Sequence, residues 1–151
     1  MGQAKRFITT VLGVIFRHPV TGATLIPLLP DGQIVLVRRR DTGKWSLPGG
    51  IVDWGEPITE TAHRELTEET GLELVKIRRL VGVYSAPDRD PRLHSISVLL
   101  AVDAQGTLAV KDGLEVSEVK AFSPQAIPLE SLSHDHARQL QDYFNGATIV
   151  D

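Results

Sequence analysis

The chain has 151 residues, of which 42% are hydrophobic and 23% are charged, and this composition predicts one globular domain over residues 1–151. The 16 Lys and Arg side chains against 19 Asp and Glu give a net charge of −3, which argues against nucleic-acid binding by bulk electrostatics. The absence of cysteine excludes disulfides, thiolate metal sites and a cysteine nucleophile. Because no apolar run approaches the roughly 18 residues of a membrane span, we expect a cytoplasmic protein with no membrane partner.

The first apolar segment, residues 7–16, follows Lys5 and Arg6 as the apolar part of a signal peptide would. It contains two threonines and several β-branched residues, and no clear small-residue cleavage site follows it. These features favour a β-strand over a signal peptide. We therefore predict that this segment forms the first strand of the domain.

Apolar runs predict further strands, and the first two are separated by the turn tripeptide Pro30-Asp31-Gly32. The runs cover residues 23–29, 33–39, 75–84, 95–102 and 119–122. One helix is predicted over residues 57–70, stopped by Gly71, and a second from the N-cap Ser133 to Asn145. Together these elements predict a compact mixed α/β (α+β) domain.

Acidic side chains are concentrated in the first predicted helix and the segment before it. Residues 50–71 contain six of the 19 acids, and Arg64 is the one Lys or Arg among them. Because positions i, i+3 and i+4 of a helix share a face, Glu65, Glu68 and Glu69 project together. An all-oxygen cluster of this kind suits Mg²⁺, Mn²⁺ or Ca²⁺ better than zinc, but a solvated acidic face is an equal alternative on spacing alone.

The residues around these acids complete a longer pattern. The segment Gly50-x5-Glu56-x7-Arg64-Glu65-Leu66-x-Glu68-Glu69-x-Gly71-Leu72 resembles the Nudix box at every defined position, over residues 50–72. Trp45-Ser46-Leu47-Pro48-Gly49-Gly50 resembles the usual approach to that box. The resemblance implies a Nudix fold, with a mixed β-sheet sandwiched between helices. It also implies hydrolysis of a nucleoside diphosphate linked to another group.

By position in the box, the resemblance implies that Glu68 and Glu69 are metal ligands. Glu65 is implied as either a ligand or the general base for the attacking water, and this choice stays open. Arg64 would orient a glutamate, and the carbonyl of Gly50 could complete the metal shell. The implied cofactor is Mg²⁺, with Mn²⁺ as a substitute.

Three further acids are candidates for a supporting role. Glu56 is the box acid outside the helix cluster, and we expect it to support Arg64 or the metals. Glu115 and Glu118 lie between the last strands, where Nudix enzymes often add an acid near the metals. An exposed acidic loop is an equal alternative for this pair.

A second segment, residues 85–94, is a loop broken by two prolines that carries Arg89 and Arg92. Such arginines suit substrate phosphates, although a solvated turn is the simpler interpretation from composition. The pattern Ser-x-Pro-x-Arg-Asp-Pro-Arg-x-His-x-Ile-Ser resembles a segment of ADP-ribose pyrophosphatase-like Nudix proteins. Leu93 departs from it, because those proteins usually have glycine there, and this leaves the loop geometry open.

Two weaker candidates for substrate binding remain. Arg39 belongs to a run of three arginines at the end of a predicted strand, where a solvated exit is the usual outcome. Trp45 could stack on a base, but a tryptophan in this place more often covers the edge of the core.

The sequence therefore predicts Mg²⁺-dependent hydrolysis of ADP-ribose to AMP and ribose 5-phosphate, with a small nucleotide as partner. One alternative is a nucleoside triphosphate pyrophosphohydrolase that removes damaged nucleotides. A non-catalytic nucleotide sensor of the same fold is a second, which the complete set of box acids disfavours. A homodimer remains open.

Overall fold

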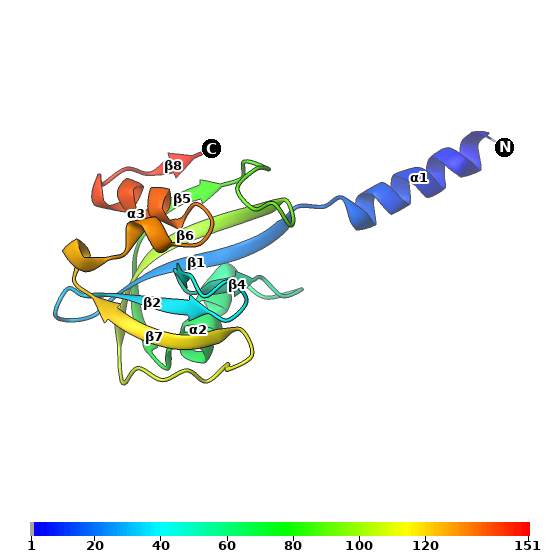
Figure 1. Ribbon diagram of the computed structural model, residues 1–151. Coiled ribbons are helices and arrows are strands. Elements are labelled where there is room, and N and C mark those ends of the chain that lie inside the picture. The colour runs from blue at the N-terminus through cyan, green and yellow to red at the C-terminus, as the bar shows by residue number, and fades with distance from the viewer. Residues whose placement is uncertain (1) are drawn as a thin grey trace.

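The computed structural model describes residues 2–151 (Figure 1). In chain order its elements are α1 (Gly2–Phe16), β1 (Val20–Leu28), β2 (Ile34–Arg39), β3 (Trp45–Ser46), β4 (Gly49–Ile51), α2 (Ile58–Thr70), β5 (Glu73–Tyr84), β6 (Ser95–Gln105), β7 (Val116–Phe122), the 3₁₀ turns η1 (Pro124–Ala126) and η2 (Leu129–Ser131), α3 (His136–Phe144) and β8 (Ile149–Val150).

The strands form one mixed sheet in the order β3-β2-β1-β6-β5-β8, with β4 added to β1 and β7 added to β2. At its centre β1 runs parallel to β6 along its whole length, from Val20 opposite Ser95 to Leu28 opposite Asp103. The β5–β8 pair is also parallel, and the remaining pairs are antiparallel. The predicted mixed sheet is confirmed, but the sequence reading missed the short strands β3, β4 and β8.

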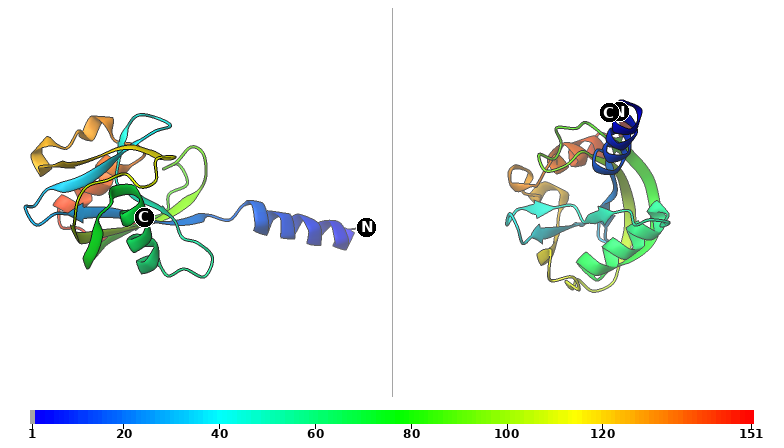
Figure 2. Two further views of the ribbon diagram at one scale, coloured as in Figure 1. Left: turned by 90° about the horizontal axis from the view of Figure 1, so that it is seen from below. Right: turned by 90° about the vertical axis from the view of Figure 1, so that its right-hand side faces the viewer.

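The sheet buries apolar side chains on both faces. Successive side chains of β1 point to opposite faces of the sheet, as strand geometry requires. Leu25 packs with the α2 residue Leu66, and Ile26 packs with the α3 residue Leu140. In β2 the four residues from Ile34 to Val37 are all buried. Helices α2 and α3 therefore cover opposite faces (Figures 1 and 2), which confirms the predicted sandwich of a sheet between helices.

Both predicted core helices form, with small shifts at their starts. Pro57 has extended backbone angles immediately before α2, and Gly71 ends it in the left-handed conformation at φ 75°. The second helix begins three residues after the predicted N-cap, Ser133, because His134 adopts a positive φ of 53°, which is incompatible with an α-helix.

The strand predicted over residues 7–16 is wrong, because this segment lies in helix α1. A strand needs a neighbouring strand for its backbone hydrogen bonds, and β1 already has β6 on one side and β2 and β4 on the other. A helix satisfies those bonds within the segment. Figure 1 and the left-hand view of Figure 2 show α1 projecting away from the sheet. None of the helices in residues 2–151 is long and apolar enough to cross a membrane.

Candidate active site

Two adjacent glycines bring strand β4 against the acidic face of helix α2. The Gly49 N–H donates a hydrogen bond of 2.9 Å to Oε2 of Glu69. Gly49 has a φ of +154°, and a Cβ there would overlap the carbonyl oxygen of Ala23 on β1. A Cβ on Gly50 would instead overlap the carboxylate of Glu65. The two glycines therefore allow carboxylates from α2 to approach the backbone of β4.

Replacing Gly50 by alanine is expected to lower turnover at least about a hundredfold, since the new methyl group must displace the Glu65 carboxylate. Gly113 is the matched control, because its backbone is not left-handed and a Cβ there meets nothing within 4 Å. Steady-state kinetics on both variants check this expectation. Equal activity of the two would show that the Glu65 position is unimportant.

Arg64 connects the acids of the site. Its Nε and Nη2 donate to the two carboxylate oxygens of Glu56, each at 2.9 Å, and its Nη1 donates to Oε1 of Glu65 at 2.6 Å. Glu56 also accepts from the Thr61 hydroxyl at 2.7 Å. These bonds from Arg64 and Thr61 lower the pKa of Glu56 to about 2, so it remains an anion. Glu56 thus holds Arg64, and Arg64 orients Glu65.

An Arg64→Lys variant tests this arrangement, because an ammonium group cannot reproduce the planar fork that binds Glu56 and Glu65 simultaneously. We expect a 10- to 100-fold loss of kcat, roughly the effect of removing a group that orients a metal ligand. The loss should be accompanied by a higher Mg²⁺ requirement in a metal titration. An unchanged Mg²⁺ requirement would contradict the orienting role of Arg64.

The three helix glutamates differ in environment. Burial raises the pKa of Glu69 to about 8, opposed by the Gly49 hydrogen bond and assisted by the negative charges of Glu65 and Glu115. Burial also raises the pKa of Glu65, although Arg64 opposes the shift. Glu68 is half exposed. The site thus gathers more carboxylates than Arg64 can neutralise, and this excess would favour a bound cation.

Residues 2–151 contain no preformed group of three or more His, Asp or Glu side chains at metal-coordinating spacing. The donors that converge here are nevertheless all oxygens, from the glutamates and the adjacent backbone of β4. Hard divalent cations such as Mg²⁺ and Mn²⁺ prefer oxygen donors. The residues therefore fit such a cation in chemistry, and Glu65, Glu68, Glu69 and Gly50 are those that could hold it.

A cleft of about 730 Å³ opens over Gly50, Glu65 and Glu68. Further acids in its lining are Asp41, Asp53, Asp90, Asp112 and Glu115. Its lining also includes Arg39, Arg64 and Arg92, and Leu93 follows Arg92. A smaller cavity of about 150 Å³ shares Gly22, Arg39, Gly49, Gly50, Asp90 and Ser95 with the cleft and extends toward His134 and His136.

Two of the arginines predicted to bind substrate reach the cleft. Arg39 bonds to Asp41 through Nε at 2.9 Å and Nη2 at 2.6 Å. Arg92 bonds to Asp90 through Nε at 3.0 Å and Nη2 at 2.8 Å, and it lies 3.6 Å from Asp41. Both guanidinium groups therefore line the same cleft as Glu65 and Glu68, and each is held by a carboxylate.

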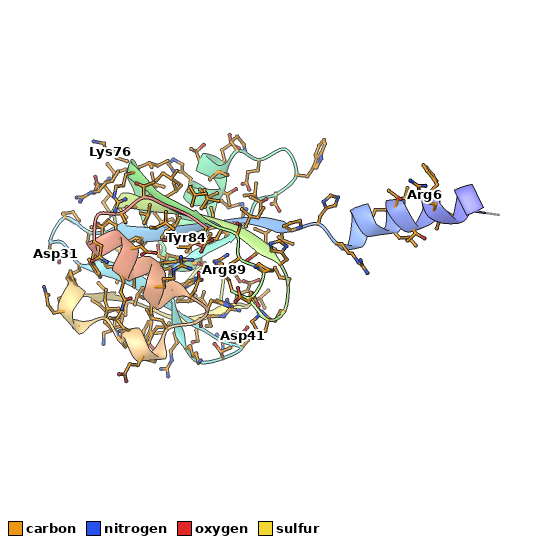
Figure 3. The ribbon with its side chains drawn as sticks, turned by 90° about the horizontal axis from the view of Figure 1, so that it is seen from above. Arg6, Asp31, Asp41, Lys76, Tyr84 and Arg89 are labelled. Atoms are coloured by element: carbon orange, nitrogen blue, oxygen red, sulfur yellow. The ribbon has the colours of Figure 1, made fainter. Side chains whose placement is uncertain are left out.

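Arg89 has a different environment from Arg92. Its side chain is 8% exposed and donates two bonds to Asp135, at 2.7 and 3.1 Å, and one of 2.9 Å to the Tyr84 carbonyl. Figure 3 shows Tyr84 and Arg89 close together inside the fold, whereas Asp41 lies at its edge. Arg89 borders the smaller cavity, but most of its donors fasten the 85–94 loop to the start of α3.

The remaining candidates also differ in their positions. Glu115 lines the cleft. Glu118, on β7, forms an ion pair with Arg38 at 3.5 Å and lines neither cavity. Trp45 packs edge-to-face on Phe122, 5.0 Å between ring centroids, and lines neither cavity. Of the two interpretations of Trp45, base stacking or covering the edge of the core, the structure shows the second.

Several polar residues of the cleft were not among the candidates predicted from the sequence. Asp53 occupies a variable position of the box, and Asp112 reaches the cleft because its backbone N–H donates 2.8 Å to the carbonyl of Glu68. Asp41 and Asp90 each lie two residues from the arginine they hold. This spacing was the one feature of the sequence that could have indicated these ion pairs. Asp112 had no such signal, because its position depends on a contact between distant segments.

A mixed sheet between two helices, with a glutamate box on one of them, is the architecture of the Nudix class. The model of the NUDIX domain family matches residues 18–143. An ADP-ribose pyrophosphatase of Methanocaldococcus jannaschii is 38% identical over 132 residues, which cover 85% of this chain and 75% of that protein. A Bacillus subtilis protein, provisionally named an 8-oxo-dGTP diphosphatase, is 38% identical over 130 residues, covering 86% of this chain and 83% of its own.

Among solved structures, the NUDIX domain of Shewanella oneidensis NrtR, complexed with ADP ribose, is similar with a TM-score of 0.78 at 22% identity. The match covers 97% of this chain and 99% of that one. This likeness supports the fold, and the family match carries the assignment. The chain therefore belongs to the NUDIX domain family, and it is a Nudix hydrolase.

Proposed function

We propose that the chain hydrolyses the diphosphate linkage of ADP-ribose to AMP and ribose 5-phosphate, with Mg²⁺ as cofactor and Mn²⁺ as a substitute. The observation that carries the proposal is the cluster of Glu65, Glu68 and Glu69 beside Gly49 and Gly50, at a cleft whose lining also includes arginines. The similarity to the M. jannaschii ADP-ribose pyrophosphatase supports the choice of substrate.

The proposed chemistry follows from charge. A diphosphate is anionic and resists attack until its charge is neutralised, and a bound divalent cation would polarise its oxygens and lower the pKa of a metal-bound water. In this chain Glu65, Glu68, Glu69 and the Gly50 carbonyl would hold the cation. Glu65 or Glu68 would accept the proton of the attacking water, because each lines the cleft. Arg39 and Arg92, which line the same cleft, would contact the phosphates.

The test is product analysis of the purified chain with defined metals. We expect AMP and ribose 5-phosphate from ADP-ribose with Mg²⁺, no turnover after chelation, and recovery with Mg²⁺ or Mn²⁺. Turnover that persists in excess chelator would overturn the metal assignment.

A second substrate class is supported by the equal identity of the B. subtilis relative, whose name indicates hydrolysis of an oxidised nucleoside triphosphate. Under this alternative, the same site would release pyrophosphate from a nucleoside triphosphate. Comparing kcat/KM for ADP-ribose and for a panel of ordinary and oxidised triphosphates decides between the two. A higher value for any triphosphate would favour the alternative.

A further inference from the structure

Helix α1 is the part of the structure that the catalytic site does not explain. We call residues 2–17 the arm. Among the side chains of the arm that the structure describes, five large apolar ones are exposed: Phe7, Ile8, Val11, Leu12 and Ile15. The arm projects from the sheet in every view that shows it from the side (Figures 1 and 2). A 15-residue helix without a packed face is marginally stable in water, so this helix needs a surface to cover it.

The exposed apolar residues share one face of the helix. Phe7, Val11 and Ile15 form one i, i+4 row, and Ile8 and Leu12 form the adjacent row. Thr10 lies on the opposite face and donates its hydroxyl to the Arg6 carbonyl at 2.9 Å. This amphipathic pattern is typical of a helix that docks along one side.

The arm is poorly placed to cover its own domain. Residues 17–19 alone separate α1 from β1, and this link contains Pro19. At its end Val20 is already fixed by a hydrogen bond of 2.9 Å from its N–H to the His94 carbonyl. The helix would have to reverse direction within that short link. A surface on another molecule is the simpler occupant.

Charge selects the kind of surface. The arm carries Lys5, Arg6 and Arg17 and no acid, whereas residues 18–151 carry 13 basic and 19 acidic side chains, a net charge of −6. Two arms paired with each other would bring like charges together. An arm of one copy against the body of another would bring opposite charges together.

The body offers exposed apolar side chains at the cleft, which we call the cleft rim: Ile51, Leu93 and Leu114, which line the cleft, and Trp54, which follows the lining residue Asp53. All four side chains are exposed, Leu114 at 87% and Trp54 completely. Acids flank them, and among these Asp53, Asp112 and Glu115 also line the cleft. The cleft rim thus combines exposed apolar area with negative charge, the complement of the arm.

We propose that the protein forms a two-fold dimer in which the arm of each copy packs its apolar face on the cleft rim of the other. The exchange is reciprocal, so each dimer contains two identical arm–rim contacts. The partner's arm would then border the entrance to the substrate cleft. This inference does not depend on which nucleotide is the substrate.

Sedimentation velocity of the full chain is the first test. We expect a dimer, and we expect the double variant Phe7→Gln/Leu12→Gln to raise the dimer dissociation constant at least about a hundredfold. Thr10→Gln is the matched control, because it places the same side chain on the opposite face of the helix. A monomeric wild-type protein, or equal dimerisation of the double variant and control, would overturn the proposal.

Cross-linking locates the contact, and the chain is suited to it because it has no cysteine of its own. A Leu12→Cys protein mixed with a Leu114→Cys protein should give a mixed dimer with a short bismaleimide. Leu12→Cys mixed with Val75→Cys should not, because Val75 is exposed near the start of β5, away from the cleft. Efficient Leu12→Cys to Leu12→Cys coupling would show arm–arm pairing and overturn the rim assignment.

Vesicle co-sedimentation addresses the other occupant that a basic amphipathic helix suggests. We expect the wild-type protein to stay in the supernatant with vesicles of one quarter phosphatidylserine in phosphatidylcholine. Binding that the Phe7→Gln/Leu12→Gln variant loses would assign the arm to an anionic lipid surface instead of a second copy.

Discussion

Replacing Glu69 by glutamine is expected to lower the turnover of ADP-ribose at least about a thousandfold, which corresponds to about 4 kcal/mol of barrier. The side chain is almost fully buried beside β4, and Oε2 accepts the Gly49 N–H. Glutamine keeps the shape and a carbonyl oxygen for that hydrogen bond, but it removes the negative charge that a divalent cation requires. Release of AMP measures the loss, and binding of ADP-ribose should be affected much less.

This variant separates chemistry from folding. Because burial raises the pKa of Glu69 to about 8, its ionised form is disfavoured in the metal-free protein, and a neutral replacement should not lower the melting temperature. Glu60→Gln is the matched control, because Glu60 is an exposed residue on the first turn of the same helix. Retained turnover in Glu69→Gln would exclude Glu69 as a metal ligand.

The sequence predicted the parts of the site whose geometry is local. Glu65, Glu68 and Glu69 share a helix face because of their spacing, and the caps at Pro57 and Gly71 set the limits of that helix. The position of β4 beside these glutamates could not be predicted in the same way. It depends on pairing between β4 and β1 and on two glycines that permit contact with the carboxylates of Glu69 and Glu65, 20 and 15 residues further along the chain.

Helix α1 shows a second limit of structure prediction from sequence. A run of β-branched and apolar residues is compatible with a strand or with a helix, and the sheet decides by offering or withholding a hydrogen-bonding partner. Since β1 starts at Val20 and is paired on both sides, residues 7–16 could not pair beside it as a further strand. Local preference could not reveal this, because it depends on the order of strands across the whole sheet.

The two arginines of the 85–94 loop illustrate the same limit on the scale of one side chain. Arg89 and Arg92 lie three residues apart and resemble the same family segment. The fold buries Arg89 against Asp135, which comes from a segment 46 residues further along, and leaves Arg92 half exposed at the cleft. We therefore expect Arg89 to contribute mainly to stability and Arg92 mainly to substrate binding.

Replacing Arg89 by leucine is expected to destabilise the fold by about 3–5 kcal/mol, because it leaves the carboxylate of Asp135 buried without its cation. The Tyr84 carbonyl also loses a donor. Urea denaturation measures the change in the free energy of unfolding. In the double variant Arg89→Leu/Asp135→Leu, both charges are gone, so the loss should be smaller than the sum of the single losses.

Arg92→Leu is the comparison that separates the two roles. Its cost in stability should be about 1 kcal/mol, since the side chain is 53% exposed and the backbone N–H of residue 92 still donates to Asp90. Its KM for ADP-ribose should rise about tenfold, because the substrate loses a cation in the lining of the cleft. If Arg89→Leu instead raised KM without lowering stability, Arg89 would be a substrate-binding residue and its pair with Asp135 would be incidental.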